Sequence, residues 1–367
     1  MSTPALFQPI RIGNTELKHR VALAPLTRLR NDAAHVPTEL VIEYYAQRAS
    51  VPGTLLVSEG TYIAPQASGQ PHAPGIWNDA QIAAWKKVVN VVHAKGSFIY
   101  CQLWALGRAA RPDLLHAEYP DFDPVSASAL AIPTNPDHVP RALTKEEIKE
   151  WVGWYAQAAK NAIAAGFDGI EVHGANGYLP DQFLQDVTNI RTDEYGGSIE
   201  NRARFMLEIV DAIVSAIGAK RTALRMSPWN KYQGMGDSAP VATFSYVVEQ
   251  LKARHPDLAY LHTVTSAAFG SEPPRDPSTE NFIAKIWDPR PLVITGGFVR
   301  ETAIKRAEEA GHIIGFGTLF IANPDLPFRL QHDLPLNAPN VDGFYVPMVA
   351  EGYTDYPFSK EFLESQK

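Results

Sequence analysis

The segment Gly169–Arg204 reads GIEVHGANGYLPDQFLQDVTNIRTDEYGGSIENRAR and begins as a short apolar strand. Three hydrogen-bonding side chains, His173, Asn176 and Tyr178, follow that strand within six residues. We expect a long loop next and a helix that begins near Ser198. Polar side chains at the end of a buried strand are typical of the C-terminal face of a (β/α)8 barrel. Two of these side chains could donate to one ligand oxygen, and the phenol could supply a proton.

Apolar strand-like runs recur along the chain and are separated by helical patterns. There are eight such runs: Val21–Pro25, Thr54–Glu59, Ser97–Trp104, Gly169–His173, Thr222–Met226, Ala259–Val264, Leu292–Thr295 and His312–Phe316. Continuous apolar strands that alternate with amphipathic helices indicate a parallel sheet covered by helices. Eight units predict an α/β fold of the (β/α)8 TIM barrel type, with residues 1–367 forming a single domain.

Two segments should lie outside the repeating units. Residues 6–17 alternate apolar and polar around Gly13-Asn14, which predicts an N-terminal β-hairpin that caps the bottom of the barrel. Residues 105–143, after the third strand, are rich in proline and lack helical periodicity. They predict a long loop excursion over the active-site face. The tail after Leu334 also reads as loop.

Helix ends are marked by local signals. Thr144 and Glu147 match a capping box, in which the Thr oxygen accepts from the helix start and the Glu side chain reaches back. Ser198 is expected to cap a second helix. Gly311 is expected to end a helix that begins near Glu301.

Composition narrows the functional classes. The chain has 367 residues, of which 45% are apolar and 20% charged, and a net charge of −7 without a basic stripe, which argues against nucleic-acid binding. No apolar run approaches the roughly 20 residues needed to span a bilayer, and no secretory signal is recognisable. We therefore expect no membrane association and a cytoplasmic protein. The lone Cys101 excludes an intrachain disulfide and a cysteine-cluster zinc site, and we expect no metal.

Several motifs together resemble one known family. They are Ala24-Pro-Leu-Thr-Arg28, Ser58-Glu-Gly60, Ala73-Pro-Gly75, Gln102-Leu-Trp104, His173-Gly-Ala-Asn-Gly-Tyr178, Asn201-Arg-Ala-Arg-Phe205 and Ile321-Ala-Asn-Pro-Asp325. With them the chain resembles the old yellow enzyme family of flavin-dependent ene-reductases over nearly its whole length. The resemblance implies FMN as cofactor, NADPH as reductant, and reduction of the C=C bond of small α,β-unsaturated carbonyl compounds. A monomer or a homodimer would fit the resemblance.

The resemblance also implies a role for each site residue. His173 and Asn176 would hold the substrate carbonyl oxygen, and Tyr178 would protonate the α-carbon after hydride transfer from FMN N5. The flavin-ring contacts would be Pro25, Leu26, Thr27, Gly60, Gln102 and Arg225, and the phosphate contacts Gly296, Gly297, Gly317 and Thr318. The substrate pocket would be lined by Trp104, Phe282, Tyr345 and Gln70. An Arg225 charge beside N1 and O2 of the ring would tune the flavin potential.

Three positions depart from the family pattern. Thr318 stands where most relatives have an arginine that pairs with the phosphate, and charge-assisted hydrogen bonds are roughly twice as strong as neutral ones. Looser FMN binding is therefore predicted. Residues 263–266, Thr-Val-Thr-Ser, replace an acidic and a basic residue that often follow the sixth strand. Gln70 replaces a pocket tyrosine of some relatives, which predicts a different substrate preference.

Other functions stay open at this point. A flavin-dependent isomerase or another non-reducing relative could use the same fold, although Tyr178 favours net reduction. A non-catalytic flavin-binding protein is a further alternative. A metal-dependent barrel hydrolase or an aldolase is less consistent with the sequence, because no second His or carboxylate cluster accompanies His173 and no strand contains a lysine for a Schiff base.

Overall fold

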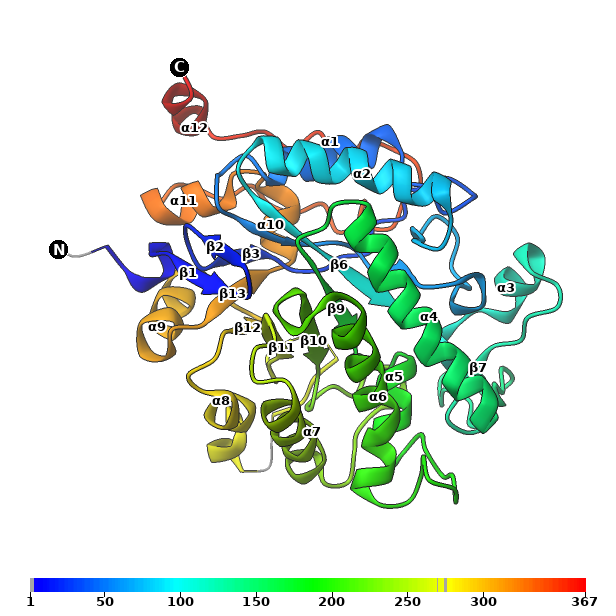
Figure 1. Cartoon of the computed structure of the whole chain (residues 1–367). Coiled ribbons are helices and arrows are strands. Elements are labelled where there is room, and N and C mark those ends of the chain that lie inside the picture. The colour runs from blue at the N-terminus through cyan, green and yellow to red at the C-terminus, as the bar shows by residue number, and fades with distance from the viewer. Residues whose placement is uncertain (1–2, 269, 274–275) are drawn as a thin grey trace.

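The computed structural model describes residues 3–268, 270–273 and 276–367, and it shows a closed parallel barrel surrounded by helices (Figure 1). The barrel strands are β3 (Val21–Leu23), β4 (Leu55–Val57), β6 (Phe98–Trp104), β9 (Gly169–His173), β10 (Thr222–Met226), β11 (Tyr260–Val264), β12 (Leu292–Thr295) and β13 (Ile313–Phe316). Each pairs in parallel with the next, and β13 pairs with β3 to close the ring. All eight strands lie within the predicted runs, so the barrel prediction is confirmed.

Helices follow the strands and cover the outside of the barrel (Figure 1). They are α1 (Glu39–Arg48), α2 (Asp79–Ala94), α4 (Lys145–Ala164), α6 (Ile199–Ile217), α7 (Pro240–Arg254), α8 (Phe282–Trp287), α9 (Arg300–Ala310), α10 (Thr318–Ala322) and α11 (Leu326–His332). The predicted helix ends are confirmed. Thr144 and Glu147 form the capping box of α4, Ser198 accepts from the start of α6, and Gly311 ends α9 in a left-handed conformation with φ +69°.

The bottom of the barrel is closed by the predicted hairpin. Strands β1 (Ile10–Ile12) and β2 (Thr15–Leu17) pair antiparallel. Their inward side chains, Ile12 and Leu17, are fully buried in one cluster with side chains from the first residues of the barrel strands, such as Tyr260. Apolar side chains therefore fill the bottom of the barrel. The chemistry of this fold is found at the opposite, C-terminal end of the strands.

Short elements interrupt the segments that the sequence predicted as loops. The excursion after β6 contains α3 (Pro112–Glu118) and a small pairing of β7 (Val125–Ser126) with β8 (Arg141–Ala142), and β5 (Thr61–Tyr62) pairs with the end of β6. Helix α5 (Leu179–Leu184) follows Tyr178, and α12 (Lys360–Ser365) lies in the C-terminal tail. The all-loop predictions were wrong there because helices of six or seven residues are too short to show a full hydrophobic period.

Buried arginines fasten the C-terminal tail, residues 335–367, to the barrel. Arg28 donates to the carbonyl oxygen of Gly352 at 2.7 Å. Arg30 donates to the carbonyl oxygen of Gly343 at 2.8 Å. Both side chains are almost completely buried, and two rings of the tail pack against them: Phe344 lies over the Arg28 guanidinium and Tyr353 over that of Arg30.

The described part of the chain contains no helix that is both long enough and apolar enough to cross a membrane.

Candidate active site

The three predicted catalytic residues come together at the end of β9. The ring centroids of His173 and Tyr178 lie 4.7 Å apart, with the ring planes at 70°. Asn176 adopts a left-handed backbone conformation, with φ +58°, and its N–H donates to Ser227 Oγ at 2.7 Å. Ser227 follows β10, so this hydrogen bond ties the turn after β9 to the neighbouring strand. The sequence placed Ser227 at a strand end but gave no signal of this role.

His173 is a neutral hydrogen-bonding group. Burial, and next the positive charge of Arg225, hold the pKa of His173 well below its usual value. A neutral imidazole carries one N–H donor and one acceptor nitrogen. Its Nδ1 is buried and has no hydrogen-bond partner within the described residues. The ring can therefore bind a ligand oxygen without introducing a full charge.

Tyr178 holds its proton at neutral pH. Burial, with a smaller contribution from Tyr232, raises the pKa of the Tyr178 phenol above its usual value, although a hydrogen bond from the Gln233 side chain opposes that shift. The phenol ring packs edge-on against Trp104, with centroids 5.0 Å apart. Gln233 itself has a left-handed backbone, φ +60°. Gln233 lies in an irregular loop without any periodic signal, so the sequence pattern does not indicate its role.

Trp104 and Gly60, both predicted site residues, are in direct contact. A Cβ added at Gly60 would lie only 2.7 Å from the Trp104 ring, so the close approach needs glycine. Another neighbour of Trp104 is Tyr62, whose ring stacks on the indole with centroids 5.0 Å apart and an interplanar angle of 11°. The Tyr62 hydroxyl donates to the carbonyl oxygen of Gln70 at 3.2 Å, which brings Gln70 to the edge of the same aromatic cluster.

A cavity of about 440 Å³ opens at the C-terminal ends of the strands. Its lining includes the predicted cofactor residues Pro25, Leu26, Arg225, Gly296, Gly297, Gly317 and Thr318. Thr27, Gly60 and Gln102 are not part of that lining. The two consecutive glycines have positive φ angles, +123° and +69°, which only glycine adopts readily. The backbone there can approach a ligand closely.

Arg225 supplies the cation of the cavity. Its Nη2 donates to Thr295 Oγ1 at 3.4 Å, and its buried Nε has no partner within the described residues. Burial lowers the pKa of the guanidinium, but arginine stays charged in proteins. The unpaired N–H makes Arg225 available for an electron-rich ligand edge.

The predicted substrate residues Tyr345 and Phe282 differ in their placement. Tyr345 lies in the tail with 63% of its surface exposed, and its phenol contributes to the raised pKa of Tyr178, so it lies near the catalytic turn. Phe282 is the first residue of helix α8. Its buried ring packs edge-on against Trp229 at 5.8 Å. No contact within the described residues joins Phe282 to the catalytic turn.

Helix α5 anchors the catalytic turn from behind. Its buried Asp181 accepts from the N–H of Gly177, inside the turn, at 2.9 Å and from Gln185 Nε2 at 2.8 Å. Burial raises the pKa of Asp181 to about 7. The sequence analysis did not assign these residues, although Asp181 and Gln185 stand four positions apart and so share one helix face.

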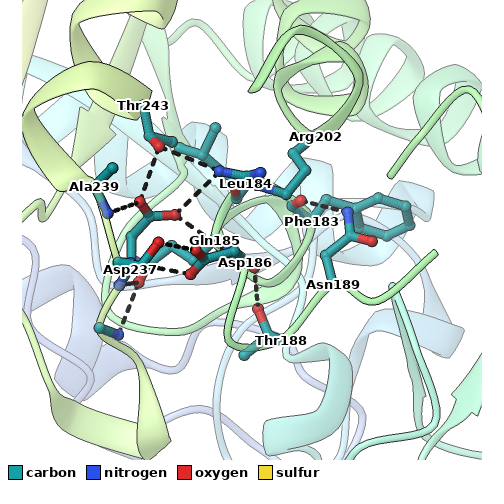
Figure 2. A network of polar contacts seen from close by, with 12 residues as sticks. Phe183, Leu184, Gln185, Asp186, Thr188, Asn189, Arg202, Asp237, Ala239 and Thr243 are labelled. Atoms are coloured by element: carbon teal, nitrogen blue, oxygen red, sulfur yellow. Dashed lines mark hydrogen bonds and ion pairs between the residues drawn. The ribbon is translucent and has the colours of Figure 1, made fainter. Parts of the chain in front are cut away.

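The same network extends to the loop after β10, as Figure 2 shows. Gln185 Oε1 accepts from the backbone N–H of Asp237 at 2.9 Å. The Asp237 carboxylate accepts from Thr243 Oγ1 at 2.9 Å and lies 3.5 Å from the Arg202 guanidinium. This loop carries Gln233, so the partner of the Tyr178 phenol and the turn that presents that phenol are held by one continuous network.

Known proteins match this chain in sequence and in fold. Residues 5–337 match the sequence profile of the NADH:flavin oxidoreductase / NADH oxidase family. The chanoclavine-I aldehyde reductase fgaOx3 of Penicillium roqueforti (strain FM164) is 49% identical, over 98% of both chains. The probable inactive reductase easA of Epichloe festucae var. lolii is 45% identical, over 100% of this chain and 98% of that one.

A solved structure shows the same fold. The old yellow enzyme from Pichia sp. AKU4542 superposes with a TM-score of 0.89 at 39% identity, covering 97% of this chain and 94% of that chain. The match of profile, relatives and fold extends over nearly the whole length and confirms the resemblance stated from the motifs. The chain belongs to the old yellow enzyme family of flavin oxidoreductases.

Proposed function

We propose that this protein is an FMN-dependent reductase of α,β-unsaturated carbonyl compounds, with NADPH as the reductant. The observation that carries the proposal is the group at the end of β9. A neutral His173, Asn176 in a fixed left-handed turn, and a protonated Tyr178 lie within one short segment. Two oxygen-binding donors beside a proton donor suit the addition of hydride and proton across a polarised double bond.

The residues at the cavity fit FMN. The unpaired Nε of buried Arg225 suits the ring edge on which negative charge gathers when a flavin is reduced. Gly296 and Gly297 line the cavity, and their backbone suits a phosphate. The remaining ring contacts would come from Pro25, Leu26, Thr27, Gly60 and Gln102, and the remaining phosphate contacts from Gly317 and Thr318.

The chain's own groups perform the polar steps of the proposed reaction. When bound, reduced FMN supplies the hydride for the β-carbon of the substrate. His173 and Asn176 donate to the carbonyl oxygen, where negative charge develops in the transition state. Donors fixed before the reaction stabilise that charge most effectively. Tyr178 gives its proton to the α-carbon, and its raised pKa keeps that proton available at neutral pH.

The class of substrate follows from the pocket and from one relative. The aromatic rings of Trp104 and Tyr62 suit a flat, apolar substrate. Gln70, Phe282 and Tyr345 are proposed to complete the pocket. The name of the Penicillium roqueforti relative, chanoclavine-I aldehyde reductase, supports an aldehyde as the activating carbonyl. We further propose that the protein is a single domain, that it acts in the cytoplasm, and that it is a monomer or a homodimer.

The main alternative is a flavin-dependent isomerase or another non-reducing relative, and one relative carries the name probable inactive reductase. The presence of Tyr178 favours net reduction, because the proton donor for the α-carbon is in place. A metal-dependent reaction has less support, since the described residues contain no cluster of three or more His, Cys, Asp or Glu able to hold a metal ion.

An anaerobic visible spectrum of the FMN-supplemented protein tests the proposal. NADPH should bleach the flavin band, and cyclohexenone or an unsaturated aldehyde should restore it. Bleaching without recovery by either acceptor would favour the non-reducing alternative. If no flavin band is retained after free FMN has been removed, the proposed function is wrong for this chain.

A further inference from the structure

A buried acid–base pair lies deeper in the barrel than the catalytic turn. Glu171 precedes His173 by two residues on β9, so both side chains stand on the same face of the strand. His262 comes from β11, and its Nδ1 lies 2.8 Å from Glu171 Oε2. Both side chains are completely inaccessible to solvent. Charged residues are rarely buried in this way without a specific partner.

The pair connects two residues that are proposed to contact the flavin ring. On one side, Gln102 Nε2 donates to Glu171 Oε1 at 2.8 Å. On the other side, His262 Nε2 lies 3.2 Å from Thr295 Oγ1, the same oxygen that accepts from Arg225 at 3.4 Å. The contacts therefore run without a break from Gln102 on β6 to Arg225 on β10.

The protonation states along this chain of contacts are consistent with one another. Burial opposes ionisation of Glu171, but His262, Arg225 and Gln102 together hold its pKa below the usual value. Burial lowers the pKa of His262, so its ring is neutral. A neutral ring that donates from Nδ1 to Glu171 must accept at Nε2 from the Thr295 hydroxyl. This chain of contacts, from Gln102 to Arg225, then contains one cation, Arg225, and one anion, Glu171.

Two consequences concern the flavin ring. Because Gln102 Nε2 is held by Glu171, the orientation of the amide is fixed. With the Gln102 nitrogen occupied in this way, the amide oxygen is the group that can accept from a ligand N–H. The Glu171 charge also offsets the Arg225 charge, which would otherwise act alone on the electron-rich edge of the ring.

We propose that Glu171 and His262 are positioning residues that orient Gln102, balance the charge of Arg225 and thereby set the reduction potential of the bound FMN. This inference rests on the proposed function, because it requires FMN at the site. Charge near N1 and O2 tunes the potential of a flavin. Loss of the carboxylate leaves Arg225 unbalanced, favours the reduced ring and makes the potential more positive.

The test uses Glu171→Gln, which removes the charge and keeps the shape. The midpoint potential of the FMN-loaded protein is measured by anaerobic spectroelectrochemical titration, together with the melting temperature. The expected result is a potential more positive than that of the wild type. A potential equal to that of the wild type in a folded, FMN-loaded variant would overturn the proposal.

A matched control separates this effect from general damage. Asp325 is also a fully buried carboxylate, and it accepts from Arg329 Nε at 2.7 Å and from Ser359 Oγ at 2.6 Å, in the segment after β13. Asp325→Asn should lower the melting temperature and leave the flavin potential unchanged. An equal shift of potential in Asp325→Asn would mean that any loss of buried charge has this effect, which also overturns the proposal.

A second pair of variants decides the matter if Glu171→Gln does not fold. His262→Leu leaves the carboxylate unpaired, so it takes up a proton and the potential should rise. His262→Asn keeps an N–H near the Nδ1 position and should restore the wild-type value. Equal potentials in these two variants would contradict the proposal. The titration needs neither NADPH nor an alkene, so a wild-type protein that binds FMN but reduces no enone would refute only the proposed function.

Discussion

Replacement of Thr318 by arginine is predicted to tighten FMN binding. Thr318 lines the cavity next to Gly317, and its side chain is exposed. A neutral hydrogen bond contributes about 0.5–1.5 kcal/mol, and one to a charged group about 1.5–3 kcal/mol. Because position 318 is exposed to solvent, we expect the arginine to strengthen FMN binding by only about 1 kcal/mol relative to the threonine. Since about 1.4 kcal/mol corresponds to a factor of ten, FMN should bind about fivefold more tightly to Thr318→Arg.

The assay is titration of apoprotein with FMN, followed by quenching of flavin fluorescence. Riboflavin lacks the phosphate, so its affinity should be the same for the wild type and the variant. Thr318→Gln, a long neutral side chain, controls for added contact area. Raising the salt concentration toward 1 M, where charges are screened beyond about 3 Å, should reduce the advantage of the arginine. Wild-type protein that binds FMN as tightly as Thr318→Arg at low salt would refute the reasoning.

Four further variants test other parts of the site. Tyr178→Phe should still be reduced by NADPH but should lose about 10²–10⁴-fold in enone reduction, because the general acid is gone; undiminished turnover in stopped-flow assays would remove Tyr178 from this role. His173→Ala should slow enone reduction by about 10²–10³-fold and weaken the binding of phenols, which resemble the enolate; an unchanged phenol affinity in spectral titrations would place the oxygen site elsewhere. Gly60→Ala should lower stability by about 1–3 kcal/mol, because its Cβ would lie 2.7 Å from the Trp104 ring; a melting temperature equal to that of the wild type would contradict this. Burial raises the pKa of Asp181 from 3.8 to about 7, so this carboxyl binds its proton more tightly in the folded state than in the unfolded state. The proton binding therefore stabilises the fold fully below about pH 4. This stabilisation, at most about 4 kcal/mol, is lost as the pH rises through 7. Asp181→Asn should therefore reduce the fall in melting temperature between pH 5 and pH 8, and the same fall in variant and wild type would speak against the assignment.

The barrel was predictable because each strand is a continuous apolar run. Both faces of such strands are buried, so the hydrophobic pattern alone located the eight barrel strands within a residue or two. The catalytic trio was predictable for a related reason. His173, Asn176 and Tyr178 are close in sequence, and a strand end fixes where a short turn must point.

The supporting residues could not be predicted, because they come from distant segments. Glu171 and His262 are 91 positions apart and meet only after the barrel has closed. In the sequence each is a single polar residue within an apolar strand, a pattern that does not reveal its partner. Gln233 and Ser227 contribute one hydrogen-bonding group each from loops, where no periodicity exists. The helix that Phe282 opens could not be predicted either, because six residues give too little pattern to be recognised.

The attachment of the C-terminal tail has a consequence for evolution. Arg28 and Arg30 bind carbonyl oxygens at Gly352 and Gly343, which every amino acid provides at its own position. The Tyr345 side chain, which lies between these two points and is largely exposed, is therefore not needed for attachment. Mutations there can reshape the entrance to the site while the tail stays in place. The two arginines that attach the tail must be kept, whereas the exposed segment that carries Tyr345 is free to change under selection for new substrates.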